Sequence, residues 1–343
     1  MNTGASRWEQ LRNSSIFWAL LALAGVMLFN LIFTPNFFSL EIKDGHLFGS
    51  LIDVVNRGAP LMLMAIGMTT VIATGGVDLS VGAVAAISAA VATTLIGSAT
   101  DVTATPMFLV VAATLGAAIL CGLWNGLLVA YANIQPMVAT LVLMVAGRGI
   151  AQLITDGQII TIYYPPFFYF GGGYLAALPV ALFIVAAVFL FAWLITRRTA
   201  LGLFIESVGT NSSASFYSGI NEKNVKLFAY VFCGFCAGIA GLIISSNVKS
   251  ADANYVGLTM ELDAILAVVI GGTLMTGGRF SLAGAVLGAL LIQSVTTTIY
   301  AFGVPPEVVQ VVKAIVVLFV VLLYSDPMRN LLARPTRQTS VQS

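Results

Sequence analysis

Almost the whole chain is apolar, and this restricts its possible folds more than any other feature. Of its 343 residues, 59% are hydrophobic and 8% are charged. A soluble domain carries about 25% charged residues and could not hide so much apolar surface from water. We therefore expect a polytopic membrane protein.

Ten apolar runs are candidate membrane spans, because a helix that crosses a bilayer core needs about 20 residues. Division at polar residues, prolines and glycines places them at 16–34, 58–74, 79–98, 106–131, 136–155, 176–196, 227–248, 262–275, 280–301 and 306–324. The first run is followed by Thr34-Pro35-Asn36 and not by a small-residue cleavage site, so we interpret it as a span. The expected fold is all-α and polytopic, with about ten transmembrane helices.

Basic residues in short loops favour the cytoplasmic side of a membrane. The ten-span count places most of them on one side: Arg7, Arg12, Arg197, Arg198, Lys223, Lys226, Arg279, Arg329, Arg334 and Arg337. Both termini are therefore expected in the cytoplasm. Most acidic residues fall in the loops of the opposite side.

A polar island from Arg197 to Lys226 interrupts the apolar chain after the sixth span. Its residues suggest two short helices separated by a glycine turn, which a soluble partner could contact. The alternative is an amphipathic helix that lies on the membrane and contacts nothing. The chain has no G-x-x-x-x-G-K-[ST] phosphate loop, so any dependence on ATP must come from another protein.

The sharpest motif, TGGVDLSVGAV, follows the second span. Asp78 and Ser80 stand just before an apolar helix, where either side chain can cap free backbone N–H groups. Gly75 and Gly76 permit a tight turn, and Gly82 follows in the same motif. We interpret it as a capped helix start in a cytoplasmic turn, with direct contact to a translocation path or a motor as the alternative.

Two further patterns carry little weight. The letters TGG and GAV recur with the same spacing at 276–286. Cys121, Cys233, Cys236 and a single His are too few for a disulfide framework or an obvious metal site. We interpret the closely spaced Cys233 and Cys236 as small core residues. No catalytic residue and no metal ligand are expected.

Three stretches resemble the permease subunits of ribose-type ABC sugar importers. They are TGGVDLSVGAV, the GTNSSASFYSGIN segment at 209–221, and the LDAILAVVIGGT and GGRFSLAGAVLGALLIQ segments within 262–293. Within that family, shorter stretches look most like the permeases of galactofuranose importers; these are 44–50, 135–140, 147–152 and 251–254.

The resemblance implies a permease of two inverted halves in the bacterial inner membrane, which imports a monosaccharide, with galactofuranose favoured. Residues 1–343 would form a single transmembrane domain with a cytoplasmic coupling loop at 197–226. The implied partners are a second permease chain, identical or homologous, a periplasmic sugar-binding protein, and a cytoplasmic ABC ATPase with fused nucleotide-binding domains. ATP and Mg would bind to that ATPase, so this chain would need no cofactor and would be no enzyme.

The resemblance also assigns residues. The coupling helix of the family carries over onto Gly209, Asn211, Ala214, Phe216, Gly219 and Ile220. Asn211 or Ser212 is the expected N-cap, and the serine-rich centre departs from the charged residues usual in the family.

Sugars call for amide, hydroxyl and aromatic groups along their path. The candidates at membrane depth are Asn30, Trp124, Asn125, Arg148, Gln152, Asn247 and Gln293. Polar residues in spans either face a pathway or join helices, and the charge of Arg148 must find a carbonyl, a carboxylate or water. A stand-alone secondary transporter or facilitator is the alternative function. The spans lack the dense relay of Asp, Glu and His that proton-coupled carriers use, which counts against this alternative, but a sugar facilitator can work with amide and aromatic groups.

Overall fold

The computed structural model describes residues 15–43, 45–97 and 106–324. Its helices are α2 (Ser15–Phe33), α3 (Ser50–Ala73), α4 (Val81–Gly97), α5 (Met107–Ala130), α6 (Pro136–Ile154), α7 (Pro165–Gly172), α8 (Val180–Arg198), α9 (Ala200–Thr210), α10 (Ser212–Tyr217), α11 (Glu222–Val248), α12 (Met260–Ile270), α13 (Leu282–Ala301) and α14 (Pro306–Tyr324). The strands are two or three residues long: β1 (Glu41–Lys43), β2 (His46–Phe48), β3 (Ile160–Thr161), β4 (Tyr174–Leu175), β5 (Leu178–Pro179) and β6 (Ser250–Ala251).

The expected all-α polytopic fold is confirmed. Each of the ten predicted spans contains a helix, namely α2, α3, α4, α5, α6, α8, α11, α12, α13 and α14. Among the described residues, seven of these helices are long and apolar enough to cross a membrane. Two shorter ones, α4 with 17 residues and α12 with 11, lie beside longer neighbours.

Several helix ends differ from the predicted span edges. Helix α3 begins at Ser50, eight residues before the predicted edge, and includes Asp53 in its first turn, where a carboxylate is favourable beside the helix dipole. Helix α11 begins at Glu222 because the Asn221 side chain caps it. Helix α12 ends at Ile270, since the glycines that follow it form a turn. Charged first turns and glycine turns therefore shift the helix ends away from the predicted edges of the apolar runs.

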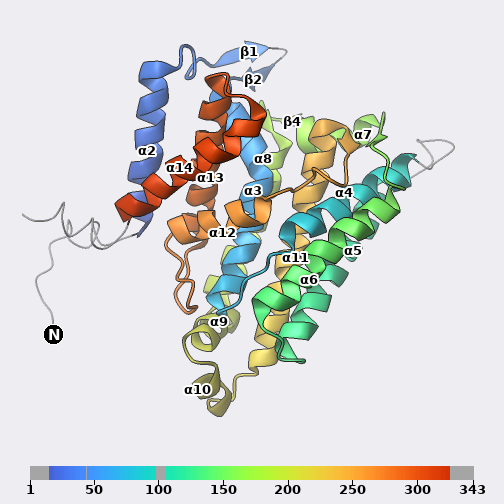
Figure 1. Cartoon of the computed structure of the whole chain (residues 1–343), viewed down its shortest axis with the longest axis vertical. Helices are drawn as coiled ribbons and strands as arrows, with labels where there is room; N and C mark the ends of the chain where they lie inside the picture. The colour runs from blue at the N-terminus through green and yellow to red at the C-terminus, as the bar shows by residue number, and fades with distance from the viewer. Residues whose placement is uncertain (1–14, 44, 98–105, 325–343) are drawn as a thin grey trace, which may run out of the picture.

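Helix α3 is the centre of the bundle, and α8, α11, α12 and α13 pack around it (Figure 1). Every residue of α3 from Gly58 to Ala73 is buried. Close approach depends on small residues: a Cβ added at Gly67 would lie 2.9 Å from the Cα of Cys233 in α11. The buried Cys233 and Cys236 are small side chains at this contact, as the sequence suggested.

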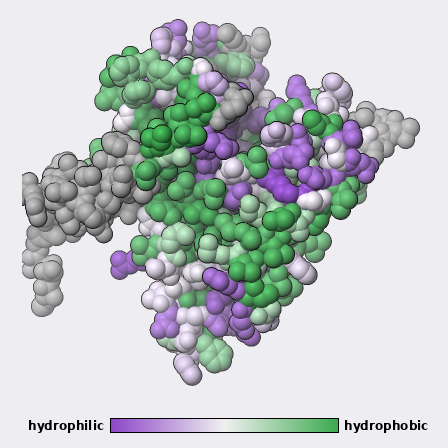
Figure 2. Space-filling model, in the orientation of Figure 1, coloured by the Kyte–Doolittle hydropathy of each residue, from purple (hydrophilic) through white to green (hydrophobic). Residues whose placement is uncertain are grey.

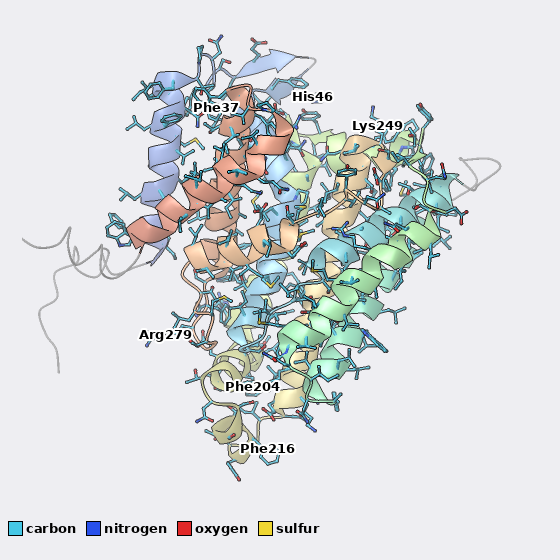
Figure 3. All side chains as sticks on the ribbon, viewed as in Figure 1. Phe37, His46, Phe204, Phe216, Lys249 and Arg279 are labelled. Carbon is cyan, nitrogen blue, oxygen red and sulfur yellow. The ribbon has the colours of Figure 1, made fainter. Side chains whose placement is uncertain are left out.

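The turns between helices gather at two ends. One end carries α9, α10 and the turns that follow α3, α5 and α12; the other carries the short strands and α7 (Figure 1). Phe204, Phe216 and Arg279 lie at the first end, whereas His46 and Lys249 lie at the second (Figure 3). Apolar side chains cover most of the visible surface between the two ends (Figure 2). The loops expected on one side of the membrane therefore do lie at one end.

Candidate functional site

Three side-chain caps shape the polar island. The Thr199 hydroxyl accepts a hydrogen bond from the Leu201 N–H at the start of α9 (3.2 Å). The Asn211 side chain accepts from the Ala214 N–H at the start of α10 (2.9 Å), which confirms it as the N-cap. Asn221 does the same for α11. The island is thus a series of capped helices and not an extended loop.

Helix α10 presents its aromatic residues outward. Phe216 and Tyr217 are 65% and 88% exposed, and Phe216 points away from the bundle at its tip (Figure 3). Ser215 is buried, and its hydroxyl donates to the Asn211 carbonyl (2.9 Å). Gly219 ends the helix with φ +83°, a conformation that suits glycine. The exposed surface of α10 therefore comprises Ser213, Ala214, Phe216, Tyr217, Ser218 and Gly219.

Lys226 ties α10 to α11. Its ammonium donates to the Ser212 hydroxyl (3.2 Å) and pairs with Glu222 (3.3 Å). A cavity of about 300 Å³ opens beside it at the same end, with Lys226 and the buried Tyr230 in its lining. Displacement of α10 would therefore pull directly on the first turns of α11.

The island contacts the rest of the bundle through a glycine joint, formed by Ala73, Gly75, Gly209, Gly277 and Gly278. The Gly278 N–H donates to the Ala73 carbonyl (2.9 Å). A Cβ added at Gly209 would overlap both groups of this hydrogen bond, and one added at Gly277 would lie 2.9 Å from the Gly75 nitrogen. The two TGG turns therefore meet against the end of α9, although they lie far apart in the sequence.

Asp78 and Ser80 of the motif after α3 are buried. The Asp78 carboxylate accepts from the N–H and the hydroxyl of Ser80 (2.9 and 2.6 Å), just before α4. The Asn125 amide donates to the same hydroxyl (2.8 Å), and Asp78 is 1% exposed. A Cβ at Gly82 would overlap the Gly257 carbonyl and the Glu261 carboxylate. These contacts stabilise the start of α4 and join it to α5, so they favour the structural interpretation of Asp78.

Two of the path candidates share one face of α6. The Arg148 guanidinium donates to the backbone carbonyls of Ala253 (3.3 Å) and Val256, so this charge does find carbonyl groups. One turn later, the Gln152 amide donates to the Asn254 side chain (2.6 Å). Figure 2 shows hydrophilic side chains among the apolar ones on this side of the molecule.

The sequence did not reveal an ion pair between two of the predicted spans. The Lys313 ammonium of α14 lies 2.7 Å from the Asp263 carboxylate of α12, and each side chain is 16% exposed. Glu261, also in α12, is 5% exposed. The available signal was a charged residue inside an apolar run, which in membranes marks a pathway or a partner. We call two separate clusters together the polar group: Arg148 and Gln152 with Asn254, and Asp263 with Lys313.

The remaining path candidates make other contacts or are exposed. Trp124 is 54% exposed on α5, and Asn125 belongs to the Asp78 cluster. The Gln293 amide donates to Thr297 within α13, and Asn247 lies against α7. Asn30 is fully buried, where its amide donates to the Thr298 hydroxyl (2.7 Å). The structure therefore brings together only some of the predicted path residues, while others join helices.

Comparisons with known proteins place the chain in a family. Residues 50–321 match the family described as "Branched-chain amino acid transport system / permease component". The chain is 52% identical to the galactofuranose transporter permease protein YtfT of Escherichia coli strain K12 over 307 residues, which cover 90% of this chain and 89% of that protein.

Two other relatives are more distant. The fructose import permease protein FruF of Bifidobacterium longum is 35% identical over 98% of this chain and 94% of its own length. The ribose import permease protein RbsC of Escherichia coli strain K12 is 34% identical over 89% and 92%. No solved structure matches the chain. The family match and these relatives confirm the resemblance: the chain belongs to the family of ABC-importer permease components that includes the ribose-type sugar permeases.

Proposed function

We propose that this chain is the membrane-spanning permease subunit of an ABC importer for a monosaccharide in the bacterial inner membrane. The observation that carries the proposal is the 52% identity to a galactofuranose transporter permease across 90% of the chain. Relatives named for ribose and fructose import support the same substrate class. Galactofuranose is therefore the first candidate sugar.

The coupling site of this importer is the exposed surface of α10. A soluble ATPase needs a protruding, rigid element that is rooted in the bundle, and α10 has caps at both ends and two exposed aromatic residues. The glycine joint connects it to the ends of α3 and α12. Closure of the ATPase would therefore move the central helix and the region of the polar group together.

The proposed importer has three protein partners besides this chain. The ATPase, with fused nucleotide-binding domains, binds ATP and Mg and docks at the α9–α10 end, which places this end and both termini in the cytoplasm. A periplasmic sugar-binding protein docks at the opposite end, and a second permease chain lies alongside. Residues 1–343 act as one transmembrane domain with the coupling loop at 197–226.

The polar group forms part of the sugar path. Its amide, carboxylate and ammonium groups can exchange hydrogen bonds with hydroxyls, which suits a polyhydroxylated substrate. The ion pair of Asp263 and Lys313 also favours a second candidate, a stand-alone secondary transporter, because ionisable pairs at membrane depth occur in ion-coupled carriers.

Competition for uptake tests the substrate. Cells that express this chain together with its ATPase, binding protein and second permease are given labelled galactofuranose. We expect an excess of unlabelled galactofuranose to abolish uptake of the label, and ribose or fructose to reduce it less. Stronger competition by ribose than by galactofuranose would contradict the sugar assignment. No competition by any monosaccharide would contradict the substrate class.

A further inference from the structure

A groove of about 470 Å³ lies on the bundle surface near the α9–α10 end. It is formed by the start of α2, the second half of α8 and the start of α13, together with Phe280 just before α13. Its walls include Ile16, Phe189, Leu190, Trp193 and Phe280, with Arg197 as the one charged residue in the lining. The groove thus joins a long apolar wall to a single positive charge.

The guanidinium of Arg197 lies at the level expected for a lipid headgroup. Arg197 is the penultimate residue of α8, a helix of membrane-spanning length, so it marks the level at which that helix leaves the hydrocarbon core. Phe189 lies eight residues earlier, about 12 Å deeper at the rise of an α-helix. The groove therefore runs from the headgroup level into the level of the acyl chains.

Neighbouring residues reinforce this assignment. The Arg198 guanidinium lies 5.6 Å from the ring centroid of Trp193, and Arg279 immediately precedes the lining residue Phe280. Tryptophan is enriched at membrane interfaces, where its ring is level with the headgroups. No acidic residue lines the groove, and among the described residues Arg197 has no salt-bridge partner.

We propose that this groove binds one phospholipid with an anionic headgroup. Its phosphate pairs with Arg197, and an acyl chain packs against Trp193, Leu190 and Phe189. Basic pockets between transmembrane helices at the cytoplasmic side recognise anionic headgroups by this combination of charge and apolar wall. A zwitterionic lipid would bring a second positive charge close to Arg197 and would bind less well.

Fluorescence quenching of Trp193 measures this lipid directly. A variant that keeps Trp193 and carries Phe at Trp8, Trp18 and Trp124 is reconstituted in nanodiscs with dibrominated phosphatidylglycerol or dibrominated phosphatidylcholine. A basic residue near an anionic lipid is expected to give about a fivefold preference in the mole fraction needed for half-maximal quenching. Phosphatidylglycerol should therefore quench at the lower fraction.

Three substitutions in this variant isolate the charge. Arg197→Gln should remove the preference, and Arg197→Lys should keep it. Lys223→Gln should leave it unchanged, because Lys223 lies at the same end but outside the groove, over the ring of Tyr131.

Three outcomes would overturn the proposal. Equal quenching by both lipids in the starting variant would mean that Trp193 meets only bulk lipid. Quenching by neither lipid would mean that residues 1–14 or a second chain fill the groove. A preference that persists in Arg197→Gln would mean that another residue attracts the anionic lipid. The first two outcomes need no change at Arg197, so the test stands even if that variant fails to fold.

Discussion

Gly209 has no room for a side chain, although it lies near the end of a helix. An added Cβ would overlap the Ala73 carbonyl and the Gly278 nitrogen, which hydrogen bond to each other. Gly209→Ala should therefore lower the free energy of unfolding by about 1–3 kcal/mol, as overpacking does. The melting temperature of the purified chain in detergent measures this loss.

Gly116→Ala is the matched control for Gly209, because nothing lies within 4 Å of a Cβ added there. Gly116 is inside α5, where alanine is the better helix former, so its melting temperature should stay the same or rise. Equal losses in the two variants would show that the glycine joint is not tightly packed.

Asp78 holds the start of α4 through buried hydrogen bonds. Asp78→Ala leaves the Ser80 N–H and hydroxyl without this acceptor, at a cost of about 1–3 kcal/mol. Thermal unfolding should show the loss, and the sugar preference of the assembled importer should not change. An altered sugar preference with normal assembly would contradict the structural role.

Asp252 provides the comparison for Asp78. Its carboxylate accepts from the Asn254 N–H (2.9 Å) in the same local pattern, but this hydrogen bond is exposed to solvent. Asp252→Ala should therefore cost less than Asp78→Ala. The residue types of both sites are visible in the sequence, whereas the burial that separates them depends on the packing of α4 against α5.

At the scale of elements, α12 and α14 are joined by the ion pair of Asp263 and Lys313. Removal of one partner leaves a charge at membrane depth, which costs up to about 3–5 kcal/mol for a buried pair. Asp263→Asn and Lys313→Gln should each lower the melting temperature, and the double variant should lose less than the sum. Additive losses would mean that the two charges do not interact.

Two nearby serines of α10 allow its contact with the ATPase to be tested separately from its folding. Ser213 is exposed, so Ser213→Lys should preserve the melting temperature but reduce the stimulation of the partner ATPase by sugar. Ser215 is buried, so Ser215→Lys should lower the melting temperature itself. Normal ATPase stimulation in Ser213→Lys would count against α10 as the coupling surface.

The helices could be predicted from the sequence because lipid demands long apolar segments, and each predicted span holds a helix. Local caps were also predictable, as Asn211 shows. Contacts between distant segments could not be predicted from the sequence. The pairing of Asp263 with Lys313 and the meeting of Gly75 with Gly277 depend on how α3, α12 and α14 pack, and hydrophobicity does not encode this arrangement.

For the whole molecule, the central claim is that sugar moves only when a separate ATPase acts on this permease. Uptake of labelled galactofuranose into proteoliposomes tests it most directly, with the chain alone or with its second permease, binding protein and ATPase. We expect uptake only from the complete set supplied with ATP. Flux of sugar down its gradient through this chain alone would contradict the account and favour the stand-alone transporter.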